Sequence, residues 1–227
     1  TVGAPSSSDN SAQIETTNFD LVADGPLFSL PAGPVRLAIG GSYRDETLTN
    51  SQLALFHTSD SLSRDVLSAF FEIHLPLVAP SNNVPLINRL DVSLAGRYDE
   101  YSDFGESFRP KVGISYEPVG GVNLRASYAN AFRAATLDQL APQVSFFAYP
   151  LPGASGTVNT LIDASGGNPD LEPETAEVFT TGIDIRPHRN GWRASATYYS
   201  IEYEDRIATP PFFFFTALTN PIAQPFI

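Results

Sequence analysis

Apolar and polar residues alternate with a period of two along much of the chain. In the segment 88–101, one side of an extended backbone would carry Leu90, Val92, Leu94, Gly96 and Tyr98. Charged and hydroxyl side chains fall on the other side, and the same period recurs in 107–118 and 121–133. Because successive side chains of a strand point to opposite faces, this pattern predicts strands with one apolar and one charged face.

Further segments follow the period less regularly and extend the prediction to about eight strands. They are 18–25, 34–46, 63–78, 174–187 and 191–206. Strands of soluble proteins average about 5 to 6 residues, whereas a tilted strand that crosses a membrane needs about 9 to 11. Most of these segments belong to the longer class. The predicted fold is therefore all-β, an antiparallel meander of about eight long strands that forms an incomplete portion of a transmembrane β-barrel.

The connections between the predicted strands alternate between two kinds. Short links are expected at 26–34, 79–87, 118–121 and 187–191. The others are 47–62, 102–106, 134–172 and the end after Arg206, of which 102–106 is short and departs from the rule. A bacterial barrel has tight periplasmic turns and longer outer loops, so 134–172 is predicted to be a long extracellular loop. A soluble β-sandwich, whose strands also alternate, has no reason to sort its loops in this way.

Aromatic residues on the predicted apolar faces fit the same interpretation. Amphipathic rings favour the interface between membrane and water. The candidate interface aromatics are Tyr98, Tyr116, Tyr128, Trp192 and Tyr198, and Phe108 and Phe132 are expected on the same faces. Ordinary core aromatics are the alternative. Charged residues such as Arg97, Lys111, Arg125 and Asp184 would face a hydrated lumen.

Composition narrows the class without identifying it. Hydrophobic residues make up 42% and charged residues 17% of the chain, which excludes a highly charged disordered polymer. There is no cysteine, and no apolar run is long enough for a transmembrane helix. The polar opening 1–18 is not a signal peptide. A net charge of -12 argues against nucleic acid as a partner.

The chain is expected to be one domain, 1–227, and to be part of a larger barrel. Eight strands could form a closed barrel by themselves. However, the first strand would start and the last would end on the outer side, whereas a complete barrel of this class normally has both termini on the inner side. The segment 207–227 holds four prolines and shows no clear closing strand. Because hydrocarbon does not tolerate open strand edges, strands are expected to be missing at both ends.

No set of residues predicts catalysis or a bound cofactor. His57, His74 and His188 are widely separated, and no Gly-x-Ser-x-Gly turn occurs. The carboxylates of Asp99, Glu100 and Asp103 could hold a hard cation such as calcium, although a solvated acidic strand end is the simpler interpretation. The chain is therefore not expected to be an enzyme.

Residues in the loops are the candidates for ligand contact, since rigid scaffolds display binding groups on loops. They are Arg133, Phe146, Phe147, Tyr149, Phe212, Phe213, Phe214 and Phe215. The aromatic ones would offer flat apolar surface to a ligand, or they would pack loop against loop at the barrel mouth.

Three stretches resemble a known family. The run FRPKVGISYEPVGGVNLRASYANAFR at 108–133, the run NPDLEPE at 168–174 and the segment 23–44 are similar to parts of the barrel of TonB-dependent outer-membrane receptors. The matches together cover most of 19–206. The family often has proline after Phe-Arg-Ala, where this chain has Ala135.

The resemblance implies a 22-stranded barrel in the bacterial outer membrane, in contact with its lipid and plugged by an N-terminal domain. A ligand such as a ferric siderophore, haem, cobalamin or an oligosaccharide would be captured outside and released inward when the TonB complex acts on the plug. No plug or TonB-contacting segment is visible in this chain. The alternatives are a passive porin-type channel and a soluble β-sandwich binding module.

Overall fold

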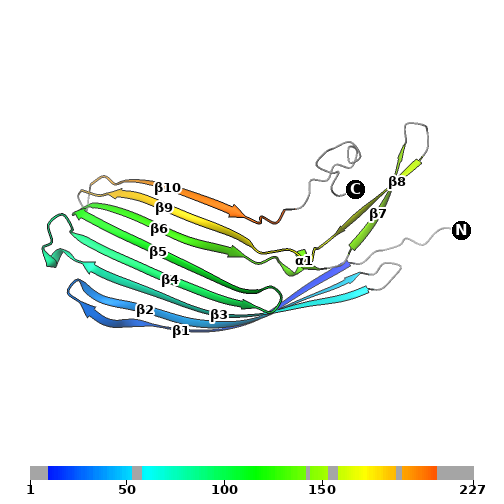
Figure 1. The fold of residues 1–227 in the computed structure, drawn as a ribbon, viewed down its shortest axis with the longest axis horizontal. Helices are drawn as coiled ribbons and strands as arrows, with labels where there is room; N and C mark the ends of the chain where they lie inside the picture. Colours follow the sequence, from blue (N-terminus) through cyan, green and yellow to red (C-terminus); the bar gives the residue numbers. More distant parts are fainter. Residues whose placement is uncertain (1–9, 53–57, 142–143, 153–157, 188–190, 209–227) are drawn as a thin grey trace.

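The computed structural model describes residues 10–52, 58–141, 144–152, 158–187 and 191–208, and Figure 1 shows their arrangement. Eight antiparallel strands form one curved sheet in the order β1-β2-β3-β4-β5-β6-β9-β10. Their bounds are Asn10–Leu30, Gly33–Gln52, Thr58–Val78, Arg89–Tyr101, Gly105–Val119, Val122–Arg133, Glu174–Ile185 and Ala194–Glu204. The expected meander of about eight long strands is confirmed.

The segment between β6 and β9 is an insertion that leaves the sheet and returns to it. β6 pairs directly with β9, from Val122 opposite Ile185 to Arg133 opposite Glu174. Between them lie the short helix α1 (Leu137–Leu140) and a separate hairpin, β7 (Val144–Pro152) and β8 (Val158–Gly166). The expected loop at 134–172 therefore contains regular structure that its sequence pattern did not predict.

The strand registers place alternate residues of the whole sheet on two consistent faces. Val92 lies opposite Ile114, and Ile114 lies opposite Ala126 on the next strand. We call this side the apolar face. The other side, the polar face, carries all nine Lys and Arg residues of the eight strands, which are Arg36, Arg44, Arg64, Arg89, Arg97, Arg109, Lys111, Arg125 and Arg133.

Burial on the two faces is the reverse of that in a soluble protein. On the apolar face, Phe19 is 69% and Phe108 is 59% exposed, whereas Asp99 and Arg64 on the polar face are 1% and 3% exposed. Among the described residues, the only other sheet is the two-stranded β7–β8 hairpin, so no second sheet covers the apolar face. The β-sandwich alternative is therefore wrong.

Strands β1, β2 and β3 are much longer than their alternation predicted. They have 21, 20 and 21 residues, about twice what a tilted strand needs to cross a bilayer. The segments 26–34 and 47–62, expected as links, are largely strand: β1 and β2 are joined at Pro31 and Ala32, and β2 continues to Gln52. Strand pairing continues in these extensions because the backbone hydrogen bonds between strands need no apolar face. The alternation of apolar and polar residues ends where both faces of the sheet can meet water.

The two ends of the sheet differ, and Figure 1 shows them at the left and right. The turn end holds the β1–β2, β5–β6 and β9–β10 links and the 3-10 turn η1 (Pro80–Asn82). The loop end holds α1 and the β7–β8 hairpin. No helix in the described ranges is long and apolar enough to cross a membrane.

Gly121 shows how tightly the turn end is built. Its φ is +88°, and a Cβ at this position would lie 2.4 Å from the carbonyl oxygen of Arg186. The Arg186 N–H donates to the Gly121 carbonyl oxygen over 2.6 Å, which ties the β5–β6 turn to the end of β9. Only glycine fits both the left-handed conformation and this approach.

Candidate functional site

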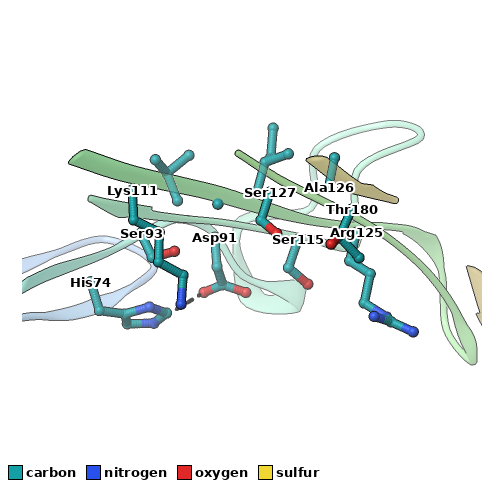
Figure 2. A pocket seen from close by; sticks show the side chains of 12 residues that line it. His74, Asp91, Ser93, Lys111, Ser115, Arg125, Ala126, Ser127 and Thr180 are labelled. Atoms are coloured by element: carbon teal, nitrogen blue, oxygen red, sulfur yellow. Dashed lines mark ion pairs between the residues drawn. The ribbon is translucent and has the colours of Figure 1, made fainter. Parts of the chain in front are cut away.

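Two of the cavities on the polar face combine charged groups from several strands, one in the middle of the face and toward the turn end and one at the loop end. Figure 2 shows the first, which has a volume of about 280 Å³ and lies over β3 to β6 and β9. His74 lies 3.5 Å from the Asp91 carboxylate, and the Lys111 and Arg125 side chains extend from β5 and β6 on the same side. Serine and threonine hydroxyls and several small or apolar residues complete the lining, so this cavity combines charges of both signs with apolar surface.

Between the two cavities lies a buried network around Asp99. Its carboxylate accepts a hydrogen bond from the Ser68 hydroxyl and one from Arg97 Nε at 2.9 Å, and it pairs with the Arg109 guanidinium. A carboxylate that is 1% exposed carries its charge only when it is paired and hydrogen-bonded. The network therefore couples β3, β4 and β5 on the polar face.

The loop-end cavity has a volume of about 390 Å³ and is the candidate ligand site. It lies between the long ribbon β1–β2 and the segment that leads from β6 into α1. Its lining joins three arginines, two aromatic rings and the start of the insertion, and comprises Ile14, Thr16, Arg44, Glu46, Arg64, Tyr101, Phe132, Arg133, Ala134, Ala135, Thr136, Leu137 and Asp138.

Arg64 is the most buried of the three arginines. Its guanidinium pairs with the Asp103 carboxylate at 2.6 Å, lies 3.8 Å from Glu46, and donates from Nη2 to the Ala135 carbonyl oxygen over 2.9 Å. It also lies over the rings of Tyr101 and Phe104, at 5.6 and 5.8 Å from their centroids. These contacts need a planar group with several N–H donors that can also stack on aromatic rings, which arginine provides and lysine does not.

Three aromatic rings pack together beside this cavity. Tyr101 and Phe104 stack with centroids 4.4 Å apart, and Phe132 lies 5.6 Å from Phe104. The Arg109 guanidinium lies 4.9 Å from the Phe132 centroid. The β6–β9 register places Phe132 on the expected apolar face, but its ring packs at the strand end against side chains of the β4–β5 hairpin.

Each arginine of the loop-end cavity is paired with a carboxylate of the chain. Arg44 lies 2.9 Å from Glu46, and Arg133 lies 2.6 Å from Glu174. An incoming anion would therefore share or exchange these carboxylate partners. The cavity can contribute flat aromatic surface and several charge-assisted donors at one place, which suits a ligand with rings and oxygen anions.

Arg133 is the sequence-predicted ligand residue whose side chain the structure describes. It lines the loop-end cavity, as expected for a residue at the start of the insertion. Phe146, Phe147 and Tyr149 lie in β7, where their backbones pair with Ala164, Asp163 and Leu161. The candidates Phe212, Phe213, Phe214 and Phe215, and the histidines His57 and His188, lie outside the described residues.

Sequence reasoning missed Arg64, Tyr101 and the α1 segment as parts of one site. The alternation of residues along the strands did contain a signal, because it places Arg44, Arg64, Arg97 and Arg109 on the same face, opposite the apolar one. The alternation alone does not show which arginines meet, because Asp103 and Ala135 reach Arg64 from turns.

Of the predicted interface aromatics, Tyr98, Tyr116, Tyr128 and Tyr198 fall on the apolar face, whereas Trp192 precedes β10 and lies in a link. Tyr116 lies nearer the turn end and donates to the Leu86 carbonyl oxygen over 2.7 Å. Tyr98 lies nearer the loop end and donates to Glu106 over 2.6 Å. Tyr128 and Tyr198 share this face, and Trp192 is exposed in the β9–β10 link. Their contact with lipid stays a prediction.

The cation site considered for Asp99, Glu100 and Asp103 does not form. Asp99 and Glu100 point to opposite faces of β4, and Asp103 pairs with Arg64. No group of three His, Cys, Asp or Glu side chains in the described part of the chain converges to hold a metal ion.

The NPDLEPE run connects the insertion to the sheet through specific hydrogen bonds. Asn168 donates its N–H to the Gln139 carbonyl oxygen over 2.7 Å and accepts from the Asp170 N–H through its side chain. Glu174 receives the Arg133 guanidinium at 2.6 Å and the Ile207 N–H at 2.8 Å. The motif therefore ties together α1, the end of β6 and the chain that follows β10.

An uncovered apolar face, a charged polar face and an open row of long antiparallel strands define part of the wall of a transmembrane β-barrel. Comparison with known proteins agrees. The family model described as "TonB dependent receptor-like, beta-barrel" matches residues 3–221. The chain belongs to this family, and the protein is a bacterial outer-membrane protein.

Individual relatives share the fold over part of their length. The chain is 27% identical over 184 residues to the ferric enterobactin receptor PirA of Pseudomonas aeruginosa, covering 77% of this chain and 24% of the relative. It is 30% identical over 131 residues to a hemin receptor of Yersinia pestis, covering 51% and 19%. The crystal structure of the siderophore receptor PirA from Acinetobacter baumannii superimposes with a TM-score of 0.67 at 21% identity, covering 86% of this chain and 28% of that one. The chain thus spans about a quarter of the length of such relatives.

Proposed function

We propose that this chain is part of an outer-membrane receptor, and not of an enzyme, that binds an iron-carrying ligand outside the cell and imports it with energy from the TonB complex. The family supports the mode of transport, and the first relative described above is a ferric enterobactin receptor. The plug and its TonB-contacting segment would belong to parts of the receptor beyond this chain. The loop end would then face the extracellular medium and the turn end the periplasm.

The lining of the loop-end cavity is the observation that supports the proposed class of ligand. Arg44, Arg64 and Arg133 line it together with the Tyr101 and Phe132 rings. Guanidinium groups bind oxygen anions through directed hydrogen bonds, and aromatic faces accept planar groups. A ferric chelate with anionic oxygen donors and flat rings fits both features, so a ferric siderophore is the proposed ligand.

A second candidate is haem, because a relative is a hemin receptor. Haem iron is commonly held by an axial histidine. Among the described residues, no histidine lines the loop-end cavity, and His74 lies instead in the other cavity with Asp91. The two ligands are therefore compared directly in the experiment.

The test uses the whole receptor in outer-membrane vesicles and in living cells. Ferric enterobactin and hemin serve as the two probes, since each is the ligand that a relative is named for. We expect saturable binding of the ferric siderophore, and uptake that stops when a protonophore removes the energy supply. Uptake that continues unchanged after the protonophore would support a passive porin instead. Binding of hemin alone would replace the proposed ligand class.

A further inference from the structure

The two legs of the β7–β8 hairpin are clamped together where they leave the sheet. The Gly167 N–H donates to the Ala141 carbonyl oxygen over 3.0 Å, and the Asn168 N–H donates to the Gln139 carbonyl oxygen over 2.7 Å. Within the described ranges, β7 and β8 pair only with each other and not with the eight-stranded sheet. Both legs of the hairpin pass through this base, which we call the clamp and define as residues 134–141 with Gly167 and Asn168.

The clamp is attached to the sheet by an apolar contact and by one buried cation. Leu137 and Ala141 pack with Leu48 and Leu62 of β2 and β3 in a small buried cluster. Beside it, Arg64 of β3 donates to the Ala135 carbonyl oxygen while it pairs with Asp103 from the β4–β5 link. One guanidinium thus joins the sheet, a neighbouring hairpin and the clamp.

The same residues form a wall of the loop-end cavity. Ala134 to Asp138 line one side, and Ile14, Thr16, Arg44 and Glu46 line the other, with Arg64 between them. A molecule in this cavity would contact the clamp and the sheet at once. Coupling between two sites is reciprocal. If a ligand stabilises one placement of the clamp, then a contact that holds the clamp in that placement raises the affinity for the ligand.

We propose that Arg64 is a positioning residue that couples occupancy of the loop-end cavity to the placement of the β7–β8 hairpin. This proposal rests on the proposed function, because it assigns a role at the same ligand site. Arg64 holds the clamp in the placement that completes the cavity wall. A bound ligand narrows the range of hairpin positions further, and loss of the Arg64 fork weakens both effects.

Substitutions at two positions loosen the clamp from opposite sides. Arg64→Gln removes the charge and the fork, whereas Arg64→Lys keeps the charge but cannot reproduce the planar pair of donors. Gly167→Ala acts on the other leg, since a Cβ there would lie 2.5 Å from the carbonyl oxygens of Ala141 and Gln139. The matched controls are Arg125→Gln, which breaks an ion pair with Asp184 elsewhere on the same face, and Gly120→Ala, where a Cβ meets nothing within 4 Å.

The experiment measures distances by electron spin resonance between labels at Thr160 in β8 and Ser61 in β3 of the intact receptor. The chain has no cysteine, so introduced cysteines can be labelled selectively within it. In the wild type we expect ferric enterobactin to narrow the distance distribution. Arg64→Gln and Gly167→Ala should broaden it without ligand and speed ligand dissociation by roughly fivefold or more, the lower end of common coupling factors. Arg64→Lys should fall between, and both controls should behave as wild type.

The outcomes separate this proposal from the proposed function. If neither ferric enterobactin nor hemin binds the wild type, the proposed function fails, and the ligand-free distance distributions still decide whether Arg64 positions the hairpin. Unchanged ligand-free distributions in both Arg64→Gln and Gly167→Ala would overturn the positioning role. Broadened distributions with an unchanged dissociation rate would overturn the coupling. A gel assay of barrel folding confirms that each variant has assembled.

Discussion

The two faces of the sheet are built by opposite rules. On the polar face the strands collect all nine of their Lys and Arg residues and bury a carboxylate, Asp99, among its partners. On the apolar face, large side chains such as Phe19 and Phe108 stand exposed with no described layer over them. The difference teaches that the medium on the apolar side is hydrocarbon, since in water the exposed and buried sets would exchange places.

The largest expected effect comes from placing a charge on the apolar face. In β4, Leu94 lies midway between Leu90, which is opposite Tyr116 of β5, and Tyr98. Leu94→Arg should therefore cost up to about 4 kcal/mol of barrel stability, as for a charge near the bilayer midplane. The neighbouring change Ala95→Arg reverses the face and should be tolerated. Unfolding of the full receptor in lipid by denaturant measures both. Equal costs would remove the distinction between the faces.

The next effect comes from breaking the buried network on the polar face. Asp99→Ala leaves Arg97 and Arg109 without their shared carboxylate. The loss should be about 3 kcal/mol, at the low end for a broken buried pair because Arg97 is 43% exposed and can hydrate. Asp184→Ala is the matched control, since it breaks a half-exposed pair with Arg125 and should cost about 1 kcal/mol or less. The same unfolding assay compares them, and equal losses would contradict the special role of Asp99.

The smallest expected difference between the two faces comes from replacing two adjacent tyrosines in β10. Tyr198 falls on the apolar face and Tyr199 on the polar face, and both are exposed in this chain. Tyr198→Ala should cost about 1 kcal/mol in lipid, less than the 1.5 to 3 kcal/mol for full burial of a large side chain. Tyr199→Ala should cost less. A larger loss at Tyr199 would reverse the assigned faces at this strand.

The strands that cross the bilayer were the most predictable part of the fold. The expected segments 88–101 and 121–133 agree closely with β4 (Arg89–Tyr101) and β6 (Val122–Arg133). There the two media impose a period of two on every residue, so the sequence records the structure directly. Beyond the bilayer this constraint ends, which is why the extensions of β1, β2 and β3 and the β7–β8 hairpin were not foreseen.

The candidate site was predictable only at its edge. Arg133 could be named because it ends a clear strand at the start of a long insertion. The partners of Arg64 could not, because Asp103 and Ala135 lie 39 and 71 residues away along the chain and belong to turns without periodicity. Tertiary contacts between loops decide the shape of the cavity, and the alternation of residues in strands carries no information on them.

The most direct test of the two-faced sheet is a scan of single cysteines along β4 in the full receptor in lipid vesicles. Spin labels at positions 90 to 95 report collisions with oxygen, which dissolves in hydrocarbon, and with a water-soluble nickel complex. We expect oxygen accessibility that alternates with a period of two, with maxima at Leu90, Val92 and Leu94. Accessibility without that period, or with its maxima at Asp91, Ser93 and Ala95, would contradict the assignment of the two faces.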